Sequence, residues 1–150
     1  MNSQVFQRRI GMADADMVII YDGQCVFCSA YVKLLRLRSA VGRVELLDAR
    51  RDGIAELAGR ELGLDLNEGM LVLYEGRHYY GADAINVLSL LTSPSGTLNR
   101  MFAATFRSRP LSRALYPALR LGRRVTLALL GRPSIAVDAT APRPVPGEHP

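Results

Sequence analysis

The hydrophobic positions of the chain alternate between short apolar runs and longer stretches with three- and four-residue spacing. The short runs predict buried strands, and the spaced stretches predict amphipathic helices. Strands are predicted at 17–21, 43–47, 70–74 and 77–80, and helices at 26–38, 53–62, 84–91, 98–106 and 111–130. The order β-α-β-α-β-β-α predicts an α/β fold in which helices connect parallel strands and the last two strands form a hairpin. The two remaining helices form a short C-terminal helical extension.

Three residues predict details of these helices. Asp83 stands immediately before the helix at 84–91 and is expected to cap it. Pro117 and Gly122 lie inside the last predicted helix. Because proline lacks an amide donor and glycine is a weak helix former, we expect them to bend or interrupt it.

The length of 150 residues suits a single domain, which we expect to span residues 17–131. Residues 1–16 contain a basic pair with no apolar stretch behind it, so they do not match a secretory signal and are expected to be a flexible N-terminus. Five of the eight prolines fall in 132–150, which predicts a Pro-rich disordered tail. No segment reaches the about 18 uninterrupted apolar residues that a membrane span needs. Together with the low cysteine content, these features predict a cytoplasmic protein.

The net charge of +5 is unevenly distributed. Residues 84–137 hold eight arginines and no acidic residue, so the C-terminal part is a basic module. In the last helix we expect an apolar stripe of Leu111, Leu115 and Leu119 to pack on the core, with the arginines in solvent. A peripheral contact of this basic helix with a membrane or a partner protein is the alternative. Nucleic-acid binding is not expected, because no nucleic-acid motif accompanies the arginines.

Both cysteines lie in Cys25-Val26-Phe27-Cys28, shortly after the end of the first predicted strand and at the start of the first predicted helix. This spacing across a helix start brings the two sulfurs within reach of a disulfide. The amides of the helix N-terminus stabilise a thiolate, so an exposed Cys25 with a lowered pKa is expected to be the nucleophile. Cys28, one turn further and more buried, is expected to be the resolving thiol. Since Val26 and Phe27 contribute no basic group, we expect a modest pKa depression and a reducing couple.

Asp22 precedes Cys25 by three residues, and two roles are open for it. Its carboxylate could accept the proton of Cys28 when that thiol attacks. It could equally cap the helix and order the turn at Gly23.

Metal binding is the main competing interpretation of the cysteines. A structural zinc site needs four ligands, whereas the chain has two cysteines and the distant His78 and His149. We therefore expect no metal and no bound cofactor. A site or cluster shared by two chains stays open, and so does a non-catalytic binding module that uses these cysteines for a metal.

The predicted order of elements is that of the thioredoxin fold, and a CxxC pair in this context is a redox signature. The stretch Val18-Ile-Ile-Tyr-Asp22-Gly-Gln-Cys25-Val-Phe-Cys28 resembles the opening motif of the DCC family of thiol-disulfide oxidoreductase-like proteins. The resemblance continues at Asp48, at Gly81-Ala-Asp-Ala84 and at Tyr116-Pro-Ala-Leu-Arg120-Leu-Gly-Arg123. It implies a thioredoxin-like fold and disulfide exchange with a protein or a low-molecular-weight thiol. In this motif Asp22, Cys25 and Cys28 match position for position.

One departure from thioredoxins concerns substrate binding. Thioredoxins place a cis-proline before the third strand, whereas this chain has Asn67-Glu68-Gly69-Met70 there. We therefore expect Gly69 or Met70 to face the cysteines and to contact substrate, together with Gly23 and Phe27.

Overall fold

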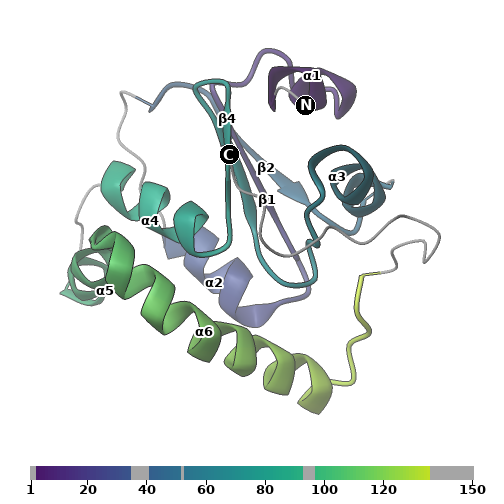
Figure 1. Ribbon diagram of the computed structural model, residues 1–150. Helices are drawn as coiled ribbons and strands as arrows, with labels where there is room; N and C mark the ends of the chain where they lie inside the picture. Colours follow the sequence, from purple (N-terminus) through teal and green to yellow (C-terminus); the bar gives the residue numbers. More distant parts are fainter. Residues whose placement is uncertain (1–2, 35–40, 52, 93–96, 136–150) are drawn as a thin grey trace.

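A four-stranded mixed sheet forms the centre of the molecule (Figure 1). The computed structural model describes residues 3–34, 41–51, 53–92 and 97–135. The strands β1 (Met17–Tyr21), β2 (Val44–Asp48), β3 (Leu71–Tyr74) and β4 (Arg77–Tyr80) lie in the order β2-β1-β3-β4. β1 pairs with β2 in parallel, and β3 is antiparallel to both β1 and β4. The predicted parallel pair and terminal hairpin are therefore confirmed.

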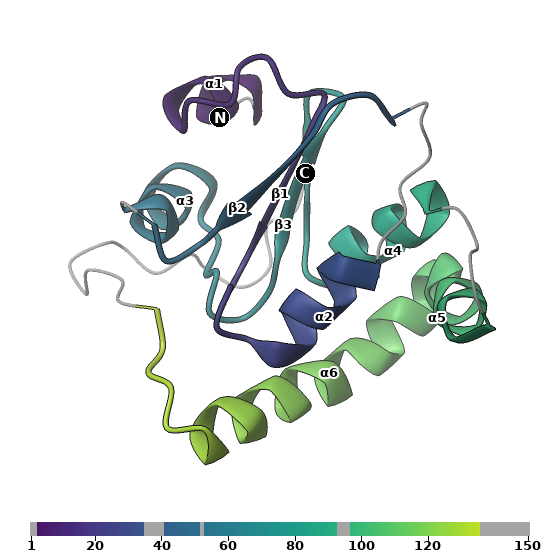
Figure 2. The same cartoon turned by 180° about the vertical axis from the view of Figure 1, so that it is seen from behind.

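Helices cover both faces of the sheet (Figure 2). One face carries α1 (Ser3–Arg9) and α3 (Ile54–Leu62). The other carries α2 (Val26–Leu34), α4 (Ala82–Leu91), α5 (Thr97–Arg107) and α6 (Arg109–Leu129). Alternate side chains of a strand point to opposite faces. Thus Val18 and Ile20 join the core beneath α1 and α3, while Met17 and Ile19 join the core on the α4 side. This arrangement is an α/β architecture consistent with a thioredoxin-like fold.

The predicted order of elements holds throughout, and the ends that can be compared differ by at most two residues. For the helix predicted at 26–38, the described part ends at Leu34 and residues 35–40 lie outside the described chain. Most of the predicted tail, residues 136–150, likewise lies outside it. No helix within the described ranges is both long enough and apolar enough to cross a membrane.

The N-terminal segment differs from the expected flexible one. It forms α1, whose Phe6 is 0% exposed and packs into the core on the α3 side. The side-chain amide of Gln7 also donates to the carbonyl oxygens of Met12 and Ala15, at 2.9 and 2.6 Å. The buried ring of Phe6 and these two hydrogen bonds hold the segment in place. Its sequence is too short and too polar to predict a helix by itself.

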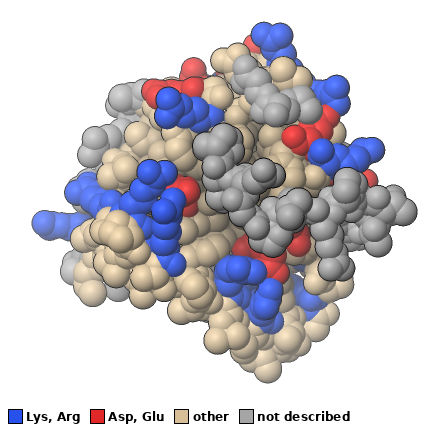
Figure 3. Space-filling view, viewed as in Figure 1, with Lys and Arg blue, Asp and Glu red and all other residues tan. Residues whose placement is uncertain are grey.

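The expected cap of α4 is a second correction. The N-cap position is Gly81, and no side chain caps the helix there. Asp83 lies inside the first turn and pairs instead with Arg109 and Arg113 of α6, at 3.2 and 3.5 Å. Acidic and basic side chains are likewise adjacent on the face shown in Figure 3.

The last helix, α6, is also not interrupted. It runs through Pro117 and Gly122 as one helix of 21 residues. It packs against α2, α4 and α5. Tertiary packing therefore outweighs the local cost of proline and glycine here.

Candidate active site

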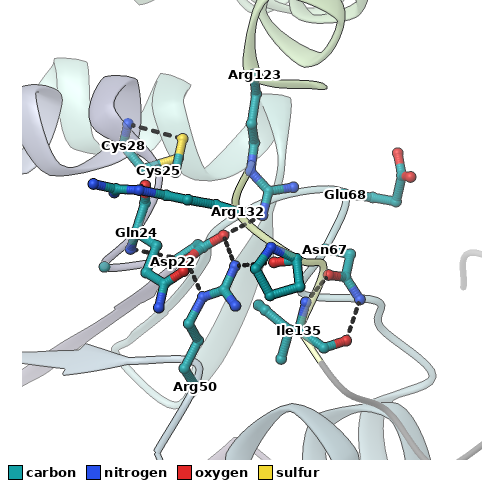
Figure 4. A network of polar contacts seen from close by, with 12 residues as sticks. Asp22, Gln24, Cys25, Cys28, Arg50, Asn67, Glu68, Arg123, Arg132 and Ile135 are labelled. Carbon is teal, nitrogen blue, oxygen red and sulfur yellow. Dashed lines mark hydrogen bonds and ion pairs between the residues drawn. The ribbon is translucent and has the colours of Figure 1, made fainter. Parts of the chain in front are cut away.

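The turn between β1 and α2 positions both cysteines (Figure 4). The Asp22 side chain orders the turn by accepting from the Gln24 amide at 3.0 Å, and the Asp22 carbonyl accepts from the Cys25 amide at 3.0 Å. Asp48, at the end of the neighbouring parallel strand, accepts from the Gly23 amide at 3.1 Å. Because β1 and β2 are parallel, their carboxyl ends meet at the edge of the sheet where the cysteines lie.

Cys25 occupies the N-cap position of α2. Its carbonyl accepts from the Ser29 amide at 2.9 Å, and its Sγ accepts from the Cys28 amide at 3.3 Å. A side chain that accepts from the amide three positions on is the usual geometry of a helix cap. Here the acceptor is sulfur, and negative charge on it is stabilised by the free amides of the first turn.

The two thiols have opposite acidities. A hydrogen bond from the Cys28 thiol, the Cys28 amide and the charge of Arg123 lower the pKa of Cys25 from 9.0 to about 6, against the opposing effect of burial. The hydrogen bond to Cys25, burial and the charge of Cys25 raise the pKa of Cys28. Cys25 is therefore a thiolate at neutral pH while Cys28 stays protonated. The depression at Cys25 is larger than the modest one expected, chiefly because the thiol and the amide of Cys28 donate to its sulfur, with a smaller contribution from the charge of Arg123.

The expected exposure of Cys25 is wrong. Cys25 is 1% exposed and Cys28 is half-buried. Two parts of the C-terminal region reach the turn that carries Cys25. Arg123 of α6 binds Asp22, and Arg132 donates to the carbonyl oxygen of Gln24 at 2.5 Å.

Asp22 lies at the centre of a buried ion-pair network (Figure 4). Arg50 donates to both of its carboxylate oxygens, at 2.7 and 3.0 Å, and Arg123 donates to Oδ2 at 2.8 Å. Burial alone would raise the pKa of Asp22, but the hydrogen bonds from Arg50 and Arg123 hold it below its ordinary value. With the Gln24 amide included, each carboxylate oxygen accepts two hydrogen bonds.

The inward face of α6 is more polar than predicted. Leu111 and Leu115 are 41% and 36% exposed, so the expected apolar stripe does not face the core except at Leu119. Instead the buried Arg123, at 9% exposure, and the hydroxyl of Tyr116 face inward, the latter donating to the Glu68 carbonyl at 2.8 Å. Periodicity missed both because it weighs only apolar residues. The motif around Tyr116 and Arg123 was the signal that could have found them.

The four residues expected to contact substrate have different environments. Gly23 packs on the Asp48 carboxylate, with no space for a side chain between them. Gly69 packs on the Tyr116 hydroxyl in the same way, and Met70 is buried in the core cluster that Cys28 borders. Phe27 lies in the first turn of α2, and its side chain is outside what the structure describes.

Replacement of Gly69 with alanine is expected to destabilise the fold by about 1–3 kcal/mol, the usual cost of overpacking. The new methyl group would overlap the Tyr116 hydroxyl and lie 3.1 Å from the Gly81 Cα. Urea unfolding followed by circular dichroism measures this change. The control is Gly59→Ala in α3, where the nearest atom would be 3.8 Å away and a gain of about 0.5–1 kcal/mol is expected. Equal stability of the two variants would contradict the packing of Gly69 on Tyr116.

Within residues 3–34, 41–51, 53–92 and 97–135, no three His, Cys, Asp or Glu side chains gather as metal ligands would. The described cysteines are free thiols. The site contains a thiolate, a neighbouring protonated thiol and the buried guanidinium of Arg123, whose positive charge acts on both sulfurs.

Comparison with known protein families agrees with this geometry. The family of DCC1-like thiol-disulfide oxidoreductases matches the chain over residues 19–127, which include most of β1, both cysteines and most of α6. No curated protein and no solved structure matches the chain. The matched region covers more than half of the sequence, and the close cysteine pair is the feature that such a redox enzyme needs. The chain therefore belongs to the DCC1-like thiol-disulfide oxidoreductases, a thioredoxin-like family of redox enzymes.

Proposed function

We propose that Cys25 is the attacking thiolate and Cys28 the resolving thiol of a dithiol–disulfide exchange. The observation that carries this assignment is the position of Cys25 Sγ at the helix cap, where it accepts from the Cys28 amide. The lowered pKa of Cys25 and the raised pKa of Cys28 support the same order of events. The thiolate attacks first, and the protonated thiol reacts only in the second step, when it resolves the mixed disulfide.

The exchange proceeds in two steps. Cys25 Sγ attacks one sulfur of a substrate disulfide, forming a mixed disulfide and releasing the other substrate sulfur as a thiolate. Cys28 then gives up its proton and attacks Cys25 Sγ, which forms the Cys25–Cys28 disulfide and releases the second substrate thiol. The substrate disulfide gains two electrons from the enzyme and becomes two thiols, with one proton coming from Cys28 and the other from solvent.

We assign Asp22 an anchoring role rather than that of proton acceptor. Its oxygens already accept from Arg50, Arg123 and the Gln24 amide. Its pKa is also lowered, which widens the gap between the pKa of this carboxyl group and that of a thiol. A base with full hydrogen-bond capacity and a low proton affinity is poorly suited to deprotonate Cys28. Asp22 instead holds Arg123 beside the cysteines.

Arg123 is then a positioning residue for the thiolate. Arg123→Gln is expected to raise the pH at which Cys25 becomes reactive, because the stabilising charge is lost. In the wild type, the rate of iodoacetamide labelling at Cys25 should rise with pH and reach half its maximum near pH 6. The variant should require a higher pH, toward that of an ordinary thiol.

The matched control for this prediction is Arg124→Gln. Arg124 is the next residue on α6, is largely exposed and pairs with Glu68 at 2.6 Å, so the pH profile of Cys25 should not change. A profile that shifts equally in both variants would show a general effect of charge and contradict the role of Arg123.

The proposed substrates are disulfides of proteins or of low-molecular-weight thiols, and the proposed location is the cytoplasm. A stabilised thiolate stabilises the reduced enzyme and so makes the couple more oxidising. We therefore propose that the reduction potential of this couple is less negative than the one expected from Val26 and Phe27 alone.

A thiol titration tests the proposed function directly. Metal-stripped protein is equilibrated with graded ratios of reduced to oxidised glutathione, quenched by alkylation and weighed by intact mass spectrometry. A reversible transition of two thiols at a defined ratio is expected. Failure to form the Cys25–Cys28 disulfide under oxidising conditions would overturn the function and favour a metal-binding or docking module.

A further inference from the structure

The chain returns across the active-site edge after its last helix. Gly131, with φ +62°, follows the end of α6, and residues 132–135, here called the C-terminal strap, run toward the α3 side of the sheet (Figure 2). Of these residues, 132–134 are exposed, whereas Ile135 is 6% exposed. The side chain of Ile135 is therefore the one part of the strap that is buried.

Contacts to the strap are made mainly to its backbone. The Asn67 side chain accepts from the Ile135 amide at 2.7 Å and donates to the Ile135 carbonyl at 3.2 Å. Arg50 donates to the Pro133 carbonyl at 2.8 Å. One amide side chain thus satisfies both backbone groups of one residue, as a neighbouring strand does. Such contacts hold an extended chain of almost any sequence.

One side chain of the strap enters the core. Ile135 belongs to the buried cluster on the α3 side, which includes Ala49 and Leu66. In the sequence these two residues directly precede Arg50 and Asn67, which make the backbone contacts. The site therefore combines backbone recognition with a place for one branched aliphatic side chain.

The strap also lies directly beside the reactive cysteine. Arg50, which holds Pro133, is the same residue that holds Asp22 (Figure 4). Arg132 covers the carbonyl of Gln24, the residue before Cys25. A disulfide must approach Cys25 Sγ closely to react, yet Cys25 is 1% exposed.

From these contacts we infer that residues 132–135 occupy the docking site of an extended polypeptide substrate that presents a branched aliphatic side chain. This inference rests on the proposed function of Cys25. The site comprises Asn67, Arg50 and the Ile135 position of the α3-side core. The strap must leave this site before a protein disulfide reaches Cys25, so it competes with substrate.

The test compares two full-length variants that gain the same charge. Ile135→Asp places a carboxylate in the apolar position and should release the strap, whereas Ser134→Asp changes an exposed neighbour and should not. Labelling of Cys25 by a bulky maleimide should be at least about tenfold faster in Ile135→Asp, the factor that corresponds to about 1.4 kcal/mol. Equal rates in the two folded variants would overturn the inference. Asn67→Ala, which removes the clamp from the other side, should also speed labelling and serves if Ile135→Asp does not fold.

A peptide added in trans tests the nature of the site. A synthetic peptide with the sequence of residues 131–137 should slow the labelling of Ile135→Asp again, and the same peptide with Asp at position 135 should not. If neither peptide slows labelling, the site does not bind polypeptide and the inference fails.

These readouts separate the inference from the proposed function. If the wild type forms no Cys25–Cys28 disulfide in the glutathione titration, the proposed function itself is overturned. The inference about the strap alone would fail if the disulfide couple is intact but Ile135→Asp and Ser134→Asp reduce insulin at equal rates and also reduce a small disulfide at equal rates. The expected result is faster reduction of insulin by Ile135→Asp than by Ser134→Asp.

Discussion

Cys25→Ser is expected to reduce disulfide exchange to the uncatalysed rate, while the protein still folds. The hydroxyl that replaces the thiol does not ionise near neutral pH and cannot form a mixed disulfide. The buried N-cap position accepts serine readily, because a hydroxyl oxygen can accept from the Cys28 amide as Sγ does. Reduction of a disulfide substrate is measured alongside circular dichroism to separate activity from folding.

Cys28→Ser is the partner experiment and should give a different result. It leaves the attacking thiolate but removes the resolving thiol, so mixed disulfides with Cys25 should accumulate in cell extract. Loss of the Cys28 thiol also removes the largest cause of the low Cys25 pKa, so trapping is best done above neutral pH. If this variant traps nothing while Cys25→Ser is inactive, the order of attack is not the one proposed.

Asp22→Ala is expected to lower the free energy of unfolding by about 3–5 kcal/mol, the cost of leaving a buried charge without its partner. Asp22 is 3% exposed, and its loss leaves both Arg50 and Arg123 without a counter-ion in the interior. Such a loss is a large share of the stability of a typical domain. Urea unfolding at neutral pH measures it.

The control is Asp83→Ala, which breaks two ion pairs that lie in solvent. Its arginine partners, Arg109 and Arg113, are more than 60% exposed, so the expected cost is about 0–1 kcal/mol. Acid provides a second check. The pKa of Asp22 is lowered on folding, so its contribution is complete above its ordinary value of 3.8 and is lost as the pH falls below that value. Wild type and Asp22→Ala should therefore converge in stability in strong acid.

Local patterns were sufficient for the order of elements and for the place of the cysteines. Met17–Tyr21 and Leu71–Tyr74 are short apolar strands, and the helices between them have clear spacing. The CxxC pair follows the first strand, and this position alone indicates a helix N-terminus. Such features depend on neighbours in the sequence, which is why periodicity and turn residues reveal them.

The parts that sequence reasoning missed depend on distant partners. Phe6 is buried only because α1 meets the core on the α3 side, and Arg123 is buried only because α6 brings it to Asp22. The basic module was expected to present its arginines to solvent. In the structure Arg124 and Arg120 pair with Glu68, an acidic residue of the preceding half of the chain. Charges that are separated along the sequence are thus paired in space, and a residue count along the chain does not reveal it.

The bond between Arg123 and Asp22 joins residues 101 positions apart, and this separation has a consequence for synthesis. A growing chain contains Cys25 and Cys28 long before it contains α6. Until that helix docks, Cys25 lacks the arginine that stabilises its charge, and a contact of such long range forms late. The nascent cysteine therefore lacks the part of its stabilisation that comes from Arg123, while the hydrogen bonds from Cys28 depend only on the local turn. Docking of the last helix thus completes the electrostatic environment of the nucleophile.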